Sequence, residues 1–513
     1  MSTLVGIDLG TTNSAIAIID NTGRPEIVPN GEGDHVTPSA VFYEPDSPDD
    51  VTVGQSAKDN AHVYPDRVMM GFKRDMSTNS PRLLDGRELS PVELSAAVLK
   101  KLVTDAAERK GPISTAVITV PANFANEARL ATIRAGKRAG LTVSHIINEP
   151  TAALFYYSYH QPVSGRVVVY DFGGGTLDVS IADVHGRRVE IVTSKGDPRL
   201  GGCDFDARLE LLIRSRYEAI AGEAFDPAVH HLSKTPEEYK KQLTVRRDCS
   251  VQVVGGKAGR TVFTITREEF EEYTSTLIAK ADLLLGAVLQ EANVLPSEIS
   301  HVFLVGGSTR MPMVAEHLER VFGKAPVCHV NPDEVVALGA ALYAAFSAPP
   351  GTLNQAQKTV VDSMALKEVA NHFFGTICRT EGPGGRRMLQ NSLIIDKNTP
   401  LPCEKTDSYY TCDDDQRSVR VTVTQSASRE TDPAFVRVIW EGELGPLPPN
   451  RQSGMEIRVT FSYDSDQIMH CRFVDVGSGL SKDIELGITT GEMDDVSDAT
   501  EDDDDDDSGP FRV

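Results

Sequence analysis

Two stretches of the chain follow the same pattern: a strand, an Asp, a tight turn with glycine, a Thr and a second strand. The first copy spans residues 5–18 and the second spans residues 168–181. Each copy is followed, further along the chain, by a strand that runs into a turn and a helix, at 117–121 and at 302–307. This repeat predicts two halves of like order that face each other across a ligand-binding cleft.

The turn in each copy has the chemistry of a phosphate-binding loop. Glycine lets the backbone N–H groups approach a phosphate closely, and the Thr hydroxyls add donors. Asp8 and Asp171 precede the two turns. They can face a polyphosphate only with a cation in between, so they predict Mg²⁺, held mostly through water. Asp178 lies on the same side of its strand as Thr176 and is a candidate to join them.

Two alternatives compete with this interpretation. A single glycine turn most often only closes a hairpin, and Asp171-Phe172-Gly173 also matches a protein-kinase motif. The other kinase motifs and the P-loop sequence are absent from the chain. Two turns in repeated order, each headed by Asp, favour nucleotide binding over both alternatives.

Composition excludes several classes of protein. The net charge of −23 argues against a nucleic-acid partner, which requires a basic face. No apolar run is long enough for a membrane span, and the first residues lack the basic region of a signal peptide. The seven cysteines are scattered without a CxxC pair, which indicates reduced thiols and a cytoplasmic protein.

The texture of the sequence divides the chain into four regions. Residues 1–347 alternate strand and helix signals, as in an α/β domain. Residues 348–368 form a linker that begins with Pro and Gly, and residues 369–490 show the short alternating strands of an antiparallel β-sandwich. Residues 491–513 include six consecutive aspartates and are expected to be a disordered, solubilising tail.

Four motifs occur in one order: IDLGTTNS at 7–14, NEPTAA at 148–153, DFGGGTLD at 171–178 and VGGSTR at 305–310. They closely resemble the seventy-kilodalton heat-shock chaperone family, the DnaK-like proteins. The resemblance covers about residues 4–346 and, more faintly, 369–486. It implies an α/β fold with an actin-like ATPase domain, a duplicated ribonuclease-H-like unit, followed by an antiparallel β-sandwich that binds peptides.

The resemblance also implies roles for residues at matching positions. The residues expected to bind the metal, mostly through water, are Asp8, Asp171 and Asp178. Phosphate binding falls to Gly10, Thr11, Thr12, Asn13, Gly173, Gly174, Gly175 and Thr176. Catalysis falls to Lys73, Glu149, Asp171 and Thr176, with Lys73 placing the attacking water. Adenosine binding falls to Glu237, Lys240, Lys241, Thr244, Gly306, Gly307, Ser308, Arg310 and Asp333. The peptide groove is formed by Tyr409, Cys412, Val419 and Val421.

Several of these residues have a plainer interpretation. Lys240 and Lys241 match a solvated helix face, and Arg310 an ordinary surface cation. Glu149 is also placed to cap a strand end, and Arg67 competes with Lys73 for the catalytic position. For the valines of the predicted groove, a position in the sandwich core is nearly as well supported.

The resemblance implies an ATP-dependent chaperone that binds ATP or ADP with Mg²⁺ and apolar segments of unfolded proteins, with a J-domain-type co-chaperone and a nucleotide-exchange factor as partners. The chain departs from the family in its polar linker at 362–368, in Pro198 and Cys203, and in having no helical lid after the sandwich. Lys367 and Glu368 are expected to resist burial. The alternative functions are an actin-like regulatory ATPase whose β-domain holds one dedicated partner, and an actin-like filament former, which the appended sandwich disfavours.

Overall fold

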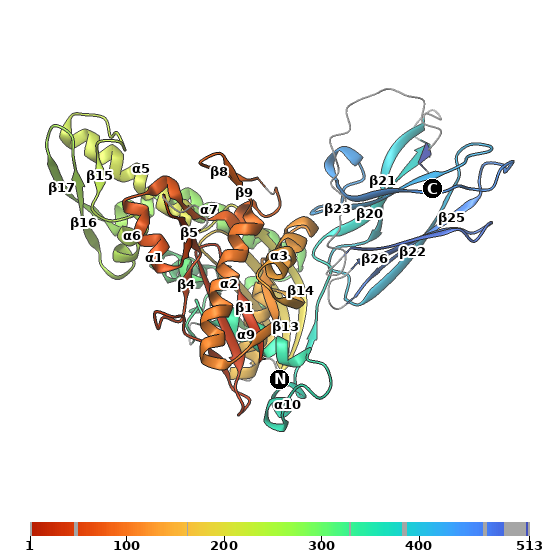
Figure 1. Cartoon of the computed structure of the whole chain (residues 1–513), viewed down its shortest axis with the longest axis horizontal. Helices are drawn as coiled ribbons and strands as arrows, with labels where there is room; N and C mark the ends of the chain where they lie inside the picture. The colour runs from red at the N-terminus through yellow and green to blue at the C-terminus, as the bar shows by residue number, and fades with distance from the viewer. Residues whose placement is uncertain are drawn as a thin grey trace.

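The computed structural model describes residues 3–45, 50–78, 80–161, 163–327, 330–381, 387–464, 469–486 and 509–510. The chain is a mixed α/β protein: a larger part made of sheets and helices lies beside a smaller part made of strands (Figure 1). Most of the predicted disordered tail, and Cys328, fall outside the described residues.

Two central sheets have the same strand order. In each, three consecutive strands form an antiparallel meander, and a later strand adds in parallel to the first of them. The internal repeat is therefore present as a repeated topology. The first sheet contains β11 (Thr142–Asn148), β10 (Ile113–Val120), β1 (Thr3–Asp8), β2 (Asn13–Ile19) and β3 (Pro25–Ile27), with β4 (Thr37–Pro38) beside β2. The second contains β18 (His301–Val305), β12 (Val163–Phe172), β13 (Leu177–Gly186), β14 (Arg188–Asp197) and β19 (Ala365–Lys367).

The helices cover these sheets, and their starts follow local sequence signals. Ser90 caps α2 through a capping box with Glu93, as the sequence Ser-Pro-Val-Glu predicts. The α-helices are α1 (Gln55–Asp59), α2 (Pro91–Lys110), α3 (Asn126–Arg138), α4 (Glu149–His160), α5 (Gly202–Ala221), α6 (Pro236–Val245), α7 (Arg267–Glu291), α8 (Pro312–Phe322), α9 (Val335–Phe346) and α10 (Gln355–Val361).

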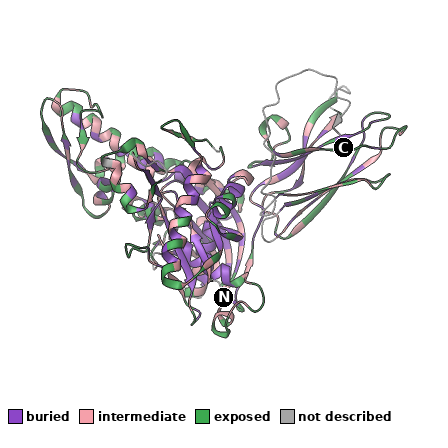
Figure 2. Ribbon diagram, viewed as in Figure 1, coloured by how far each residue is buried: buried purple, intermediate pink, exposed green. Residues whose placement is uncertain are grey.

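Helices α9 and α4 pack between the two central sheets. Backbone atoms are in direct contact where α9 crosses β1 and where it crosses α4. A Cβ added to Gly6 of β1 would lie 2.0 Å from the Ala341 nitrogen of α9. One added to Gly339 of α9 would lie 1.8 Å from the Ala152 oxygen of α4. Glycine is required at both crossings because any side chain would push the layers apart. One cluster of buried apolar side chains spans both central sheets together with α4 and α9, and buried residues are concentrated in this region (Figure 2).

Smaller sheets complete the larger part. The sheet of β15 (His231–Leu232), β16 (Asp248–Val254) and β17 (Arg260–Thr266) lies at its far end from the strand-only part (Figure 1). Two others consist of β6 (Val51–Val53), β5 (Ala40–Tyr43) and β7 (Val68–Met70), and of β8 (Arg82–Leu84) and β9 (Arg87–Leu89). Short 3-10 turns include η3 (Phe72–Asp75) and η5 (Gly307–Arg310).

The smaller part contains two antiparallel sheets with an apolar core between them. One sheet contains β21 (Arg387–Ile395), β20 (Phe373–Glu381), β23 (Val419–Ser426) and β24 (Arg437–Leu444). The other contains β22 (Cys403–Tyr410), β25 (Glu456–Tyr463), β26 (Met469–Asp475) and β27 (Ser481–Leu486). The two-residue strand β28 (Gly509–Pro510) pairs with β23, so the prediction of disorder is wrong at these two residues.

The segment between the two parts, predicted as an interdomain linker, contains regular secondary structure. It forms α10 and then β19, which pairs in parallel with β14 at the edge of the second sheet. Glu368 is buried, so the expectation that it resists burial is wrong, whereas Lys367 stays exposed beside Glu190. Burial raises the pKa of Glu368, an effect that the charge of the buried Arg129 opposes.

One carboxylate links the two parts of the molecule. Glu291, at the end of α7, is 3.0 Å from Lys397 Nζ and accepts a 2.8 Å hydrogen bond from Asn398, both in the smaller part. It also meets Lys195 and Thr193 of β14. Burial alone would raise the pKa of Glu291, but the hydrogen bonds from these partners lower it to about 2. The Glu291 carboxylate is therefore ionised at any ordinary pH.

We predict that Glu291→Gln loosens the sandwich from the larger part. The substitution leaves the Lys397 side chain, only 7% exposed, without a counter-charge, and breaking such a buried pair costs about 3 kcal/mol. Small-angle X-ray scattering should show a larger radius of gyration, with faster amide exchange around Asn398. Glu319→Gln, at an exposed site on α8, is the control. An unchanged radius in both variants would show that Glu291 does not hold this interface.

Candidate functional site

A cavity of about 620 Å³ lies where the turns of the two central sheets face each other. Its lining includes the β1–β2 turn, the β12–β13 turn, α6, η5 and the start of α9. Every predicted nucleotide-site residue lines it except Asp178, which is fully buried behind the β12–β13 turn. The residues that it brings together are Asp8, Gly10, Thr11, Thr12, Asn13, Lys73, Glu149, Asp171, Gly173, Gly174, Gly175, Thr176, Glu237, Lys240, Lys241, Thr244, Gly306, Gly307, Ser308, Arg310 and Asp333.

The two turns touch each other. A Cβ on Gly174 would lie 1.5 Å from Thr12 Oγ1, and one on Gly175 would lie 2.4 Å from Thr11 Oγ1. Both glycines therefore allow an approach that alanine would block. Thr12 Oγ1 is buried and has no hydrogen-bond partner among the described residues. Such a buried hydroxyl is normally satisfied, so a ligand oxygen is the expected partner.

The first glycine of each turn uses its N–H group within the protein. Gly10 donates to Ser14 Oγ at 3.1 Å, and Gly173 donates to the Thr176 carbonyl at 3.0 Å. These bonds close the two hairpins and orient the residues that follow. The backbone donors for a phosphate must therefore come from the later turn residues: Thr11, Thr12, Gly174 and Gly175.

The β12–β13 turn is held from behind by α5 and η3. Its Gly174 carbonyl accepts from the Cys203 N–H at 2.8 Å, at the start of α5. Its Gly175 carbonyl accepts from Arg74 Nε at 2.8 Å, and the same guanidinium forms a two-pronged ion pair with Asp204. Arg74 thus joins the first half of the larger part to the second half at the turn.

Four carboxyl groups and one ammonium group form the electrostatic centre of the site. Burial, together with the charge of Glu149, raises the pKa of Asp8 to about 7, against the opposing effect of Lys73. The pKa values of Asp171 and Asp178 are raised well above their usual range by burial and again by Glu149. The cluster therefore favours an added cation.

Lys73 and Glu149 form a buried ion pair at the edge of this cluster. Lys73 Nζ donates to Glu149 Oε1 at 2.5 Å, and the Lys73 side chain is only 3% exposed. Lys73 belongs to η3, and Glu149 opens α4. The competing Arg67 pairs with Asp85 instead and does not line the cavity.

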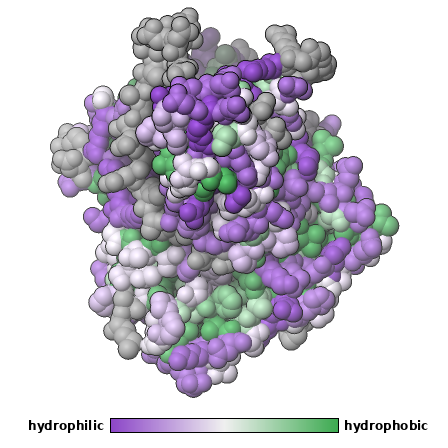
Figure 3. Space-filling view, turned by 90° about the vertical axis from the view of Figure 1, so that its right-hand side faces the viewer, coloured by the Kyte–Doolittle hydropathy of each residue, from purple (hydrophilic) through white to green (hydrophobic). Residues whose placement is uncertain are grey.

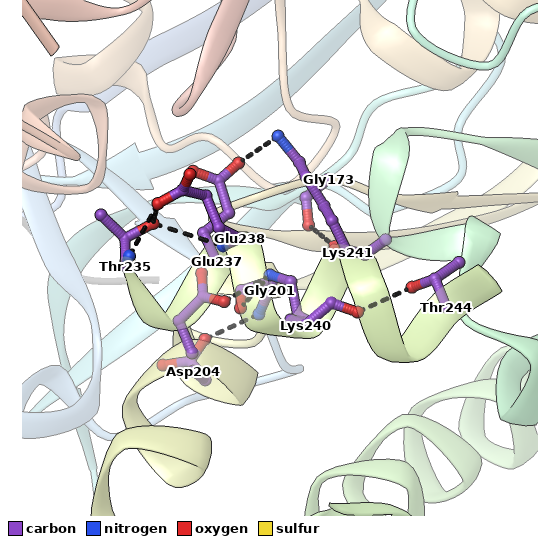
Figure 4. Close-up of polar contacts among 12 residues, drawn as sticks. Gly173, Gly201, Asp204, Thr235, Glu237, Glu238, Lys240, Lys241 and Thr244 are labelled. Atoms are coloured by element: carbon purple, nitrogen blue, oxygen red, sulfur yellow. Dashed lines mark hydrogen bonds and ion pairs between the residues drawn. The ribbon is translucent and has the colours of Figure 1, made fainter. Parts of the chain in front are cut away.

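Helix α6 forms one wall of the cavity (Figure 4). A capping box of Thr235 and Glu238 fixes its start. Lys240 is buried and donates to the Gly202 carbonyl at 2.8 Å, so it is not part of a solvated helix face. Lys241 is exposed and pairs with Glu237 at 2.8 Å, which matches the plainer interpretation more closely.

Another part of the lining comes from η5 and the loop before α9. Arg310 donates to Asp333 at 2.7 Å and to Asn331 at 2.6 Å, which fixes the guanidinium although it is half exposed. Ser308 Oγ donates to the Gly173 carbonyl at 2.7 Å, so this wall is attached to the phosphate turn.

Sequence reasoning missed several residues of the cavity. Lys58 of α1 reaches Glu237 at 2.5 Å and closes the cavity between α1 and α6. Asp206, paired with Lys240 at 2.8 Å, and Cys203 also line it. The i,i+3 spacing of Cys203 and Asp206 at the start of α5 was the only local signal for these two residues.

The residues present fit a hydrated Mg²⁺ ion. Among the described residues, no three His, Cys, Asp or Glu side chains are placed to ligate a metal directly. The raised pKa values of Asp8 and Asp171 nevertheless show that negative charge is poorly compensated at this point, and Mg²⁺ normally keeps several waters and takes the rest of its ligands from phosphate oxygens. Asp8 and Asp171 would hold the waters of the ion from the two turns, with Asp178 behind them.

The predicted peptide-groove residues are buried. Tyr409, Val419 and Val421 belong to the sandwich core and are at most 1% exposed, and Cys412 is 6% exposed. Their side chains therefore do not line an open groove in this structure, and their role in binding peptides stays a prediction. An alternating strand pattern shows which face is buried but not whether a ligand or the second sheet covers it.

Comparison with known families decides what kind of protein this is. The family model described as Hsp70 protein matches residues 4–507, nearly the whole chain. The chain belongs to the Hsp70 family. Hsp70 proteins are chaperone-type ATPases that bind ATP or ADP with Mg²⁺, unfolded peptides and co-chaperones. In the part of this Hsp70 chain that the structure describes, no helix is both long and apolar enough to cross a membrane.

We predict that Lys73→Ala lowers single-turnover ATP hydrolysis by about 10²-fold, as the loss of a transition-state donor does, while Mg·ADP binding persists. Arg67→Ala is the control, because Arg67 carries the same charge but lies outside the cavity. Rapid-quench measurement of γ-phosphate release compares the two. Full hydrolysis in Lys73→Ala together with loss in Arg67→Ala would mean that the wrong cation was assigned.

We predict that Gly174→Ala weakens ATP binding by about tenfold or more. The added Cβ would lie 2.8 Å from Thr12 Cβ as well as 1.5 Å from Thr12 Oγ1, so the two turns must separate, which costs about 1–3 kcal/mol. Calorimetric titration with ATP measures the effect. Gly286→Ala is the matched control, because nothing lies within 4 Å of a Cβ there. Equal affinity in the two variants would show that the turns need not touch.

Proposed function

We propose that this chain is an ATP-dependent chaperone, in which an actin-like domain hydrolyses ATP slowly and controls how the β-sandwich binds apolar segments of unfolded proteins. The single observation that carries this proposal is the contact between the two turns, which brings Asp8 and Asp171 to one point of a 620 Å³ cavity. Family membership supports the same function class.

The residues of the cavity divide the work of binding the nucleotide. The later turn residues, from Thr11 and from Gly174 onwards, offer backbone N–H groups to the phosphates, and Thr12 Oγ1 offers a hydroxyl. Helix α6 and η5 also line the cavity, and there Lys240, Arg310 and their acidic partners would hold adenosine. Bound Mg²⁺ would neutralise phosphate charge beside Asp8 and Asp171.

The reaction itself needs little from side chains. Phosphoryl transfer depends mainly on positioning and charge stabilisation, and Lys73 is the buried cation of the cluster. Glu149 fixes the Lys73 ammonium, which would direct water and the terminal phosphate. Lys73 is engaged in its ion pair with Glu149, and among the described residues of the cavity no side chain is set apart as a strong base, in keeping with slow, switch-like hydrolysis.

A contiguous set of contacts connects the cavity with the sandwich. Glu149 follows Asn148, whose side chain accepts a 2.6 Å hydrogen bond from the buried Arg129. The charge of Arg129 acts on Glu368, which directly precedes the sandwich. At the neighbouring start of α3, the Asn126 N–H donates to Gln425 of β23 at 3.0 Å. These contacts support a coupling between nucleotide and peptide that the polar linker alone would not suggest.

The second candidate is a regulatory ATPase whose sandwich holds one dedicated partner. Tyr409, Val419 and Val421 are buried and line no open apolar groove in this structure. This observation favours the regulatory ATPase. A peptide array distinguishes the candidates, since a chaperone binds many apolar segments and a regulator binds one.

We predict that an apolar peptide leaves the chain within seconds, with only a modest difference between ATP and ADP, because residues 487–513 carry few apolar side chains that could cover a bound peptide and differences in affinity lie mainly in the off-rate. Stopped-flow release of a fluorescent leucine-rich peptide measures this. Release over many minutes in ADP that becomes fast in ATP would contradict this prediction. Absence of binding in either nucleotide would refute the chaperone function itself.

A further inference from the structure

The sheet of β21, β20, β23 and β24 contains a gap between β20 and β23. These neighbours pair only at one end, where Phe373–Gly375 meet Thr424–Ser426. Beyond that point, β20 pairs with β21 alone. At Thr422 a side-chain hydroxyl accepts the Ile377 N–H at 2.9 Å in place of a backbone bond. The edge of β23 at Val419–Val421 therefore has β24 on one side and no β20 partner on the other.

Strand β28 occupies this gap. Gly509 pairs with Val419 and Pro510 with Arg420, in parallel, and β28 also lies close to β20. The sandwich ends at Leu486 of β27, so residues 487–508 connect it to β28. A segment of this length can reach up to roughly 75 Å when fully extended, which is more than enough to return to the same domain.

The sequence of this segment suits a short, displaceable strand. Gly509 has no side chain to obstruct a close approach between two strands. Pro510 lacks an N–H group, so it cannot extend a full ladder and limits the pairing to a few bonds. Phe511 and Val513 follow, which gives the end of the segment the apolar character of a chaperone ligand. The pairing is therefore specific in direction but weak.

Charge favours the same pairing. Asp507, the last of the six aspartates, precedes Gly509 by the two residues by which Arg417 precedes Val419. Arg417 and Arg420 are both about half exposed. They already meet Asp415 and Glu441, so the additional attraction is modest. Viewed from the sandwich end, the surface is largely hydrophilic, with separate hydrophobic patches (Figure 3).

We propose that the segment beginning at Gly509 is an internal ligand of the sandwich, which fills the gap between β20 and β23 by strand addition and must leave before an extended peptide binds there. The inference rests on the proposed peptide-binding function and adds its regulation. A tethered segment acts at an effective concentration near 1 mM. If its own dissociation constant is about 100 µM, it weakens the apparent affinity for a competing peptide by about tenfold.

The test compares the full chain with a variant in which residues 509–513 are replaced by an equally long Gly/Ser sequence. Fluorescence anisotropy with a fluorescein-labelled leucine-rich peptide should give an affinity about tenfold higher for the variant. Without peptide, amide exchange at Val419–Val421 should be faster in the variant than in the full chain. A synthetic Gly-Pro-Phe-Arg-Val peptide should bind the variant and restore the slow exchange. Asp502–Asp507 are retained in both chains, so net charge hardly changes.

The outcomes separate this inference from the function on which it rests. Equal leucine-peptide affinity in the two chains would overturn the internal ligand and leave the chaperone function intact. Binding of the Gly-Pro-Phe-Arg-Val peptide alone, with no leucine-rich peptide bound, would support the internal ligand and overturn the chaperone function. Concentration-dependent dimers of the full chain that disappear in the variant would overturn an internal contact, because the segment would then bind a second copy.

Discussion

The contact between the β1–β2 turn and the β12–β13 turn is the constraint on which the rest of the site depends. Because Gly174 and Gly175 lack side chains, the two turns meet at Thr12 and Thr11. Their preceding aspartates are thereby buried together, and burial raises the pKa of both. Negative charge in such a cluster is poorly solvated and poorly compensated, so the cluster favours a cation and, with it, the phosphates that the turns can bind.

The layers of the molecule maintain this contact from a distance. Helices α9 and α4 cross β1 and each other at Gly6 and Gly339, where the backbones touch. Arg74 adds a direct link, because it joins η3 of one half to the β12–β13 turn of the other. Close-packed layers of this kind transmit strain, so we expect a change at the turns to reach α4, and Arg129 through its hydrogen bond with Asn148 at the start of that helix. The segment that leads to the sandwich lies against this same region.

Much of this arrangement could be predicted from the sequence, for local reasons. The repeated turn placed Asp8 and Asp171, and the capping box at Ser90 placed the start of α2. Other features depend on tertiary contacts that no local pattern encodes. Glu368 is charged and was expected to stay in solvent, but it is buried near Arg129. Glu291 shows no motif, and its role as a link arises only when Lys397 reaches it from the sandwich. The alternating pattern around Val419 is the same for a core residue and for a groove residue.

Calorimetric titration of the full chain with ADP, with and without Mg²⁺, measures whether the two turns form a Mg²⁺-dependent phosphate site. Without a cation, the phosphates would face Asp8, Asp171 and Glu149, and Lys73 beside them is already paired with Glu149. We expect ADP to bind at least about 10²-fold more weakly in EDTA than in Mg²⁺, a difference of roughly 3 kcal/mol. Equal affinity under the two conditions, or no binding under either, would contradict the account of the two turns as a Mg²⁺-dependent phosphate site.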